Sequence, residues 1–171
     1  DSLSKFDAIL VLLPTTAKPD RRLPARAQWQ SLAARDKNEH ATVRATEFET
    51  PRRSLGVLGW CREEAEPFEV LRVAGAVAQK LLLERPRVSR IAIVVQSAPR
   101  RRHAWQEALC AALLTHGFRM PAEKASAQPA PKPLRITLFG GSKLDLPRVV
   151  ATSEATNLVR HLTALPPNRL D

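Results

Sequence analysis

The sequence has few of the features that mark a secreted, membrane-spanning or disulfide-rich protein. Its 171 residues include two cysteines, Cys61 and Cys110, which stand far apart and share no metal-ligand spacing. Such a pair is more typical of a reducing cytoplasm than of a disulfide framework. No apolar run approaches the roughly 20 residues that a membrane-spanning helix requires, and no signal-like segment opens the chain. We therefore expect a cytoplasmic protein with no membrane association.

The sequence also lacks the short motifs of several enzyme classes. No His-Glu-x-x-His pair occurs, and none of the histidines has a cysteine or carboxylate at zinc-ligand spacing. The Gly-x-Ser-x-Gly elbow of a serine nucleophile is absent as well. The backbone amides of Gly140-Gly141-Ser142-Lys143 would suit a phosphate, but the segment lacks Walker spacing, and a turn into the next helix explains it better. We expect no catalytic residue, metal ligand or cofactor in this chain.

Length and composition are those of one globular domain. Apolar residues make up 44% and charged residues 26% of the chain, which is ordinary for such proteins, and the length suffices for a sizeable core. The net charge of +10 would attract phosphates or acidic surfaces. Because the basic clusters are short, we favour a compositional bias spread over a solvated surface.

Apolar periodicity predicts strands that alternate with helices. The run 8–13 is continuously apolar, which is typical of a strand covered on both faces, whereas 42–48 alternates and predicts a half-exposed edge strand. Further strands are predicted over 55–60, 91–95 and 134–139, and helices over 23–35, 68–84, 104–116 and 149–164. Helices of this length between strands imply crossover connections and a sheet covered on both faces. The predicted fold class is α/β, a three-layer sandwich.

Two predicted helices carry a clear core-facing stripe. In the first, the stripe consists of Val70, Val73, Ala74, Val77, Ala78 and Leu81. In the second it consists of Trp105, Ala108, Leu109, Ala112 and Leu113, and Gly117 ends this helix. Residues 121–133 hold four prolines and no apolar periodicity, so we expect an exposed and poorly ordered connector.

Arg100, Arg101 and Arg102 form an unusual cluster of charge. They precede the helix expected to start near Ala104, where the positive end of the helix dipole disfavours cations by about 0.3–1 kcal/mol each. Either the side chains extend into solvent, or an anion such as a nucleic-acid phosphate neutralises both them and the helix end. No aromatic residues interleave with the basic ones, so a stacking platform for single strands is not expected. These arginines are the candidate anion or nucleic-acid contacts.

The last stretch of the chain carries the most specific pattern. An apolar helix face that includes Leu158 and Leu162 runs into the break Pro166-Pro167-Asn168. The stretch resembles the segment that joins the two domains of cytosol (leucyl) aminopeptidases, which typically reads Asn-Leu-Ala-Arg-Asp-Leu-x-Asn-x-Pro-x-Asn-x-Leu-x-Pro. The residues that match in register are Asn157, Leu158, Arg160, Leu162, Pro166, Asn168 and Leu170. His161 and Ala164 depart, because the family usually has Asp and Asn there.

The resemblance extends over nearly the whole chain as that family's amino-terminal domain. It implies a mixed sheet flanked by helices, similar to the macro-domain fold, over residues 1–150, and a linker helix over 151–171 that leads to an absent catalytic domain. That carboxyl-terminal domain would bind two divalent metals, zinc or manganese, through a motif resembling Asn-Thr-Asp-Ala-Glu-Gly-Arg, which does not occur here. The whole enzyme would remove amino-terminal residues from peptides as a cytoplasmic hexamer. This chain would be non-catalytic and would support assembly.

Two further expectations concern the last helix and an alternative function. Leu158 and Leu162 should be core contacts. The alternative to the aminopeptidase hypothesis is a binding module, either for nucleic acid through the arginines or for an ADP-ribose-like ligand through Gly140-Gly141. In that case we expect weak and diffuse binding of DNA.

Overall fold

One mixed sheet forms the centre of the computed structural model, which describes residues 5–23, 25–34, 43–118, 134–140 and 144–164. Its strands lie in the order β2-β3-β1-β4-β5. Neighbouring strands pair in parallel, except that β2 runs antiparallel to β3. The strands are β1 (Ala8–Pro14), β2 (Val43–Glu47), β3 (Leu55–Cys61), β4 (Arg90–Val95) and β5 (Arg135–Phe139).

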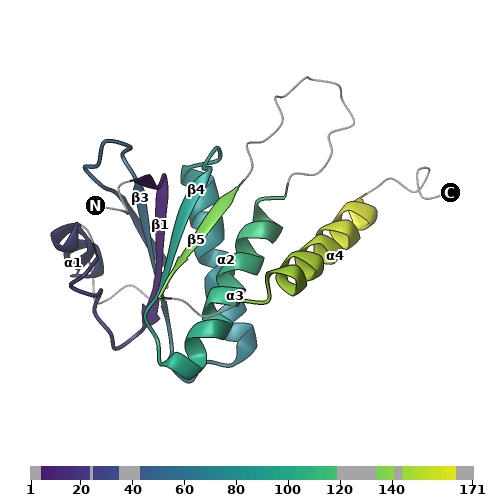
Figure 1. Cartoon of the computed structure of the whole chain (residues 1–171), viewed down its shortest axis with the longest axis horizontal. Helices are drawn as coiled ribbons and strands as arrows, with labels where there is room; N and C mark the ends of the chain where they lie inside the picture. Colours follow the sequence, from purple (N-terminus) through teal and green to yellow (C-terminus); the bar gives the residue numbers. More distant parts are fainter. Residues whose placement is uncertain (1–4, 24, 35–42, 119–133, 141–143, 165–171) are drawn as a thin grey trace.

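Helices cover both faces of this sheet (Figure 1). On one face lies α1 (Arg26–Ala34), on the other lie α2 (Pro67–Glu84) and α3 (Pro99–His116), and α4 (Leu146–Ala164) packs along α3. Among the described helices, none combines the length and the apolar content needed to cross a membrane. The predicted three-layer α/β sandwich with a mixed sheet is confirmed.

Strand β1 is buried along its whole length because both of its faces are covered. Leu10 and Leu12 belong to the cluster under α2 and α3, whereas Ile9, Val11 and Leu13 belong to the cluster under α1. The continuous apolar run predicts this placement, since a strand that is covered on one side only would alternate. The position of β1 in the middle of the sheet places its two ends at the centre of two opposite surfaces.

The remaining strands and helices lie close to their predicted positions. The core stripe predicted for α2 is buried in full, and β2 is a half-buried edge strand as predicted. The start predicted for α3 is wrong, because this helix begins at Pro99 rather than near Ala104. Proline fixes φ near the helical value and is favoured at the first helical position. The predicted connector 121–133 lies outside the described residues.

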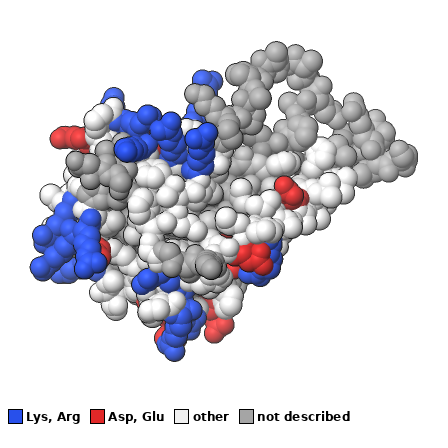
Figure 2. Space-filling model, viewed as in Figure 1, with Lys and Arg blue, Asp and Glu red and all other residues white. Residues whose placement is uncertain are grey.

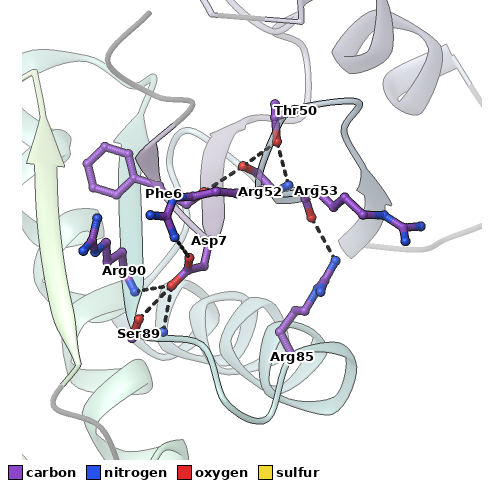
Figure 3. A network of polar contacts seen from close by, with 9 residues as sticks. Phe6, Asp7, Thr50, Arg52, Arg53, Arg85, Ser89 and Arg90 are labelled. Atoms are coloured by element: carbon purple, nitrogen blue, oxygen red, sulfur yellow. Dashed lines mark hydrogen bonds and ion pairs between the residues drawn. The ribbon is translucent and has the colours of Figure 1, made fainter.

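A polar network fastens the amino ends of the strands (Figure 3). Asp7 Oδ2 accepts hydrogen bonds from Ser89 Oγ at 2.8 Å and from the backbone N–H of Arg90 at 2.9 Å. Ser54 Oγ donates to the carbonyl of Phe6 at 2.7 Å. These bonds hold the beginning of β1 against the segments that lead into β3 and β4. The opposite surface, at the carboxyl ends, is the more open one.

Candidate functional site

Glu64 holds two of the three arginines that the sequence singles out. Its carboxylate oxygens lie 3.0 Å from Nη2 of Arg100 and 2.6 Å from Nη2 of Arg101. Nη1 of Arg101 also donates to the carbonyl of Ala65 at 3.1 Å. The hydrogen bond and the charge of Arg101, followed by the charge of Arg100, hold the pKa of Glu64 below its usual range. The carboxylate therefore stays ionised beside the arginines.

A second carboxylate, that of Glu63, lies at the start of α3. Its Oε1 accepts a hydrogen bond from the backbone N–H of Ala98, the residue before the first turn, at 3.0 Å. Negative charge stabilises the positive end of a helix dipole, so the chain itself supplies compensation at the place where the sequence predicts a bound anion. The side chain of Arg100 remains 74% exposed, and a role in binding nucleic acid or another anion stays a prediction.

Arg102 is directed away from the other two arginines. Its Nη1 donates to the carbonyl of Gly140 and its Nη2 to the carbonyl of Ser97, each at 3.3 Å. Gly140 has a φ of +83°, a left-handed conformation that glycine adopts without strain. The structure thus keeps Arg100 and Arg101 together on Glu64 and places Arg102 between the carboxyl ends of β4 and β5.

A cavity of about 730 Å³ opens beside Arg102. Its lining combines the strand ends at Pro14, Val95 and Phe139 with residues of the loops that follow them. Two residues that the sequence singles out, Arg102 and Gly140, lie in this lining. The cavity itself is not predicted, because periodicity gives the strands but not their order. The usable signal is a polar residue directly after a buried parallel strand, such as Gln96 after β4, since the carboxyl ends of parallel strands share one edge of a sheet.

The remaining reactive side chains are scattered. In the described ranges, no group of three or more His, Cys, Asp and Glu residues could hold a metal ion. Burial raises the pKa of both Cys61 and Cys110 to about 11, with a smaller contribution from a nearby glutamate in each case. Burial, followed by the charge of Arg160, lowers the pKa of His116. None of these groups lies in the lining of the cavity.

The orientation of α4 differs from the prediction. Leu158 and Leu162 are not core contacts, because 56% and 43% of their surfaces are exposed. The buried positions are Val149, Ser153 and Asn157, at four-residue steps on another side of the helix. The predicted division at residue 150 falls within α4, since this helix is continuous from Leu146 to Ala164.

Polar contacts with α3 account for this orientation. Asn157 Nδ2 donates to the carbonyl of Leu114 at 3.3 Å, and Arg160 Nη1 donates to that of Thr115 at 2.7 Å. The last four carbonyls of a helix have no hydrogen-bond partner within that helix. Helix α4 supplies donors to two of these carbonyls at the end of α3. Turning Leu158 inward would remove these donors from α3.

The described basic residues lie in separate places on the face that Figure 2 draws. Figure 2 shows separate groups of Lys and Arg at the upper, left and lower margins of one face, with acidic residues beside some of them. Several of the arginines form ion pairs, such as Arg148 with Glu107 and Arg85 with Glu47. This distribution agrees with the compositional bias that the sequence analysis favours.

Known proteins match this chain through their structures. No protein-family model matches it, and no curated protein matches its sequence. A mutant of tomato leucine aminopeptidase matches over 95% of this chain and 36% of its own, with a TM-score of 0.65 and 13% identity. Leucyl aminopeptidase from Leishmania major, solved with actinonin, matches over 97% of this chain and 34% of its own, with a TM-score of 0.58 and 13% identity. The bottromycin maturation enzyme BotP, solved with Mn, matches over 96% of this chain and 33% of its own, with a TM-score of 0.54 and 16% identity.

The chain shares the fold of these enzymes. It spans about a third of their length. The leucyl aminopeptidase resemblance that the sequence analysis draws from the last helix is confirmed at the level of fold, over nearly all of the chain. The likenesses do not bear on the alternative, a module that binds nucleic acid or an ADP-ribose-like ligand.

Proposed function

We propose that this chain is the amino-terminal, non-catalytic domain of a leucyl aminopeptidase that removes amino-terminal residues from peptides. The observation that carries the proposal is the shared fold: 95–97% of this chain matches only about a third of each enzyme. The pattern from Asn157 to Leu170, which resembles the family's interdomain segment, supports the same assignment independently. The domain would serve the enzyme as a structural part.

Catalysis would belong to a carboxyl-terminal domain outside these 171 residues. Two divalent metals there, zinc or manganese, would polarise the scissile carbonyl and provide a hydroxide nucleophile. The structure of BotP with Mn supports manganese as one of the candidates. We place the whole protein in the cytoplasm as a hexamer, in line with the family resemblance.

The outer side of α4 would face the catalytic domain. Leu158, Val159 and Leu162 expose 56%, 59% and 43% of their surfaces there, next to each other on the helix. A group of large apolar side chains on a surface commonly marks a contact with another protein part. The opposite side of α4 is fixed on α3, so the helix presents these side chains in one direction.

An assay of aminopeptidase activity tests the proposed function. The product of the complete gene should hydrolyse leucyl anilide in the presence of manganese or zinc, and a chelator should abolish the turnover. The 171-residue chain alone should give no turnover above a blank that contains the metal. Metal-dependent hydrolysis by the chain alone, or an inactive complete product, would reject the proposal.

A further inference from the structure

The outer side of α2 leaves large apolar side chains in solvent. Phe68 near its start and Leu83 near its end are 78% and 73% exposed, and Leu71, one turn after Phe68, is 50% exposed. The buried stripe of α2 lies on the other side of the helix and packs in the core, so these side chains point away from the sheet. Apolar groups of this kind on a surface commonly mark a contact with another protein.

Phe68 and Leu83 lie on one line along the helix, fifteen residues apart. The positions between them follow at steps of three and four residues, which keeps them on the same side of the helix. These positions are Arg72, Gly75 and Gln79. The outer stripe of α2 therefore has an apolar residue at each end, a polar residue next to each end and no side chain at its middle.

This order is symmetric about the middle of α2. If a second copy of the helix lies antiparallel, with the two-fold axis beside Gly75, then Phe68 of each copy meets Leu83 of the other. Arg72 then meets Gln79, whose amide oxygen accepts hydrogen bonds from donors such as a guanidinium. Gly75 allows the two helices to approach closely where they cross. A two-fold contact between identical chains requires this kind of self-complementary surface.

The charges of α2 suit the same antiparallel arrangement. Glu66 and Glu69 lie at the start of the helix, whereas Arg85 and Arg87 lie at and beyond its end. Among the described residues, neither Glu66 nor Arg87 enters an ion pair. An antiparallel copy brings each acidic start beside a basic end, and it sets the positive end of one helix dipole beside the negative end of the other. A parallel copy would bring like charges together, which disfavours association.

We propose that α2 forms a contact between two copies of this chain, in which the two helices pack antiparallel through Phe68 and Leu83. The second copy covers the apolar ends that one chain leaves exposed. The outer side of α4 stays available for the catalytic domain, since α3 packs between α2 and α4. The contact gives the assembly role proposed above a surface, but it does not depend on the aminopeptidase assignment, because it needs only this chain.

Disulfide formation in the 171-residue chain tests the arrangement. The double variant Phe68→Cys/Leu83→Cys should give a covalent dimer under mild oxidation, because each new thiol meets the other position in the second copy. A disulfide within one chain is excluded, since the two positions lie about 22 Å apart along the helix and a disulfide needs Cα atoms within about 7 Å. Cys61 and Cys110 are buried and do not compete.

The two single variants, Phe68→Cys and Leu83→Cys, are the controls for this experiment. Each should stay monomeric on a non-reducing gel, because in the antiparallel pair neither position meets its own copy. No covalent dimer from the double variant, or as much dimer from either single variant, would overturn the proposal.

Sedimentation of charge variants measures the same contact without a covalent bond. Phe68→Glu and Leu83→Lys should each weaken dimerisation by about tenfold or more, because each change occurs twice in a two-fold contact. The combined variant should regain affinity, since the two new charges meet across the contact. Leu158→Glu changes an exposed apolar residue of α4 instead and should leave dimerisation unchanged. Equal losses from Phe68→Glu and Leu158→Glu, or a wild-type chain that stays monomeric at about 1 mM, would overturn the proposal.

Discussion

At the scale of single residues, two glycines of β3 set how closely the layers approach. A Cβ at Gly56 would lie 2.6 Å from Cε2 of Phe48, on the side covered by α1. A Cβ at Gly59 would lie 2.6 Å from Cγ2 of Val77 in α2, on the opposite side. Real Cβ atoms do not approach other atoms this closely, so both positions require glycine for packing.

Replacing Gly56 with alanine should therefore destabilise the fold by about 1–3 kcal/mol through overpacking. The free energy of unfolding, measured by urea denaturation, provides the check. The loss should be smaller when Phe48 is first changed to leucine, because a smaller side chain relieves the contact. An unchanged loss in the Phe48→Leu background would show that the ring of Phe48 is not the cause.

Asp7 is a partly buried residue at which pH should act on stability. Partial burial alone would raise the pKa of its carboxyl, but hydrogen bonds from Ser89 and Arg90 and the charge of Arg52 outweigh burial and lower it from the ordinary value of 3.8. A lowered pKa means that folding favours the ionised form. The stabilisation is thus complete above about pH 4 and is lost as the pH falls through the lowered pKa.

Asp7→Asn should cost about 1.5–3 kcal/mol at neutral pH, the usual range for hydrogen bonds to a charged group. Because the wild-type carboxylate is protonated in acid, the difference in unfolding free energy between wild type and variant should narrow below about pH 4. Urea denaturation across this pH range measures the difference. Glu49→Gln, which removes an exposed carboxylate in the segment between β2 and β3, is the control and should change stability little at neutral pH. A difference that stays constant down to pH 2 would contradict the role of the ionised carboxylate.

At the scale of elements, α4 is held by Val149 at its start, which is part of the core, and by polar side chains nearer its end. Asn157 and Arg160 donate to the last carbonyls of α3, while Leu158 and Leu162 face outward. Leucines usually contribute more to stability than amides because they are buried, but here the leucines are exposed and the amide of Asn157 is buried. In the isolated chain, a buried amide of this helix should matter more than an exposed leucine.

Leu162→Ala should accordingly change the unfolding free energy of the chain by less than about 0.5 kcal/mol, as for other surface substitutions. Asn157→Ala should cost about 0.5–1.5 kcal/mol, because it removes the hydrogen bond to Leu114. Chemical denaturation of the two variants side by side gives the comparison. A larger loss for Leu162→Ala than for Asn157→Ala would mean that α4 packs with its leucines inward.

Apolar periodicity predicts the buried side of an element well when that burial depends on apolar residues alone. The stripe of α2 and the run of β1 have one apolar arrangement each, and both are buried as predicted. Helix α4 has apolar residues on more than one side, so its orientation depends on donors for the carbonyls of another helix, which no local pattern reveals. The cavity is likewise not predictable from a local pattern, because it depends on the order of the strands in the sheet. Of the arginine cluster, the sequence shows the charges but not their carboxylate partners, since Glu64 is distant from Arg100 along the chain.

At the scale of the whole molecule, the two ends of the sheet differ. The amino ends of the strands are closed by the network around Asp7, whereas the carboxyl ends open into the cavity beside Arg102. On the face drawn in Figure 2, the described Lys and Arg residues form separate groups. Helix α4 adds an apolar surface along α3. The cavity and the outer side of α4 are two surfaces of the described residues at which a partner could bind.

The central claim is that this chain supports a larger aminopeptidase, to which it presents the outer side of α4. Labelling with a maleimide tests it, because Cys61 and Cys110 are buried and their raised pKa values, about 11, keep background reaction low. Leu158→Cys and Leu162→Cys are compared in the 171-residue chain and in the complete gene product, with Arg87→Cys, at an exposed position after α2, as control. The account predicts rapid labelling of all three variants in the chain alone, and protection of positions 158 and 162, but not 87, in the complete protein. Equally rapid labelling of positions 158 and 162 in both proteins would contradict it.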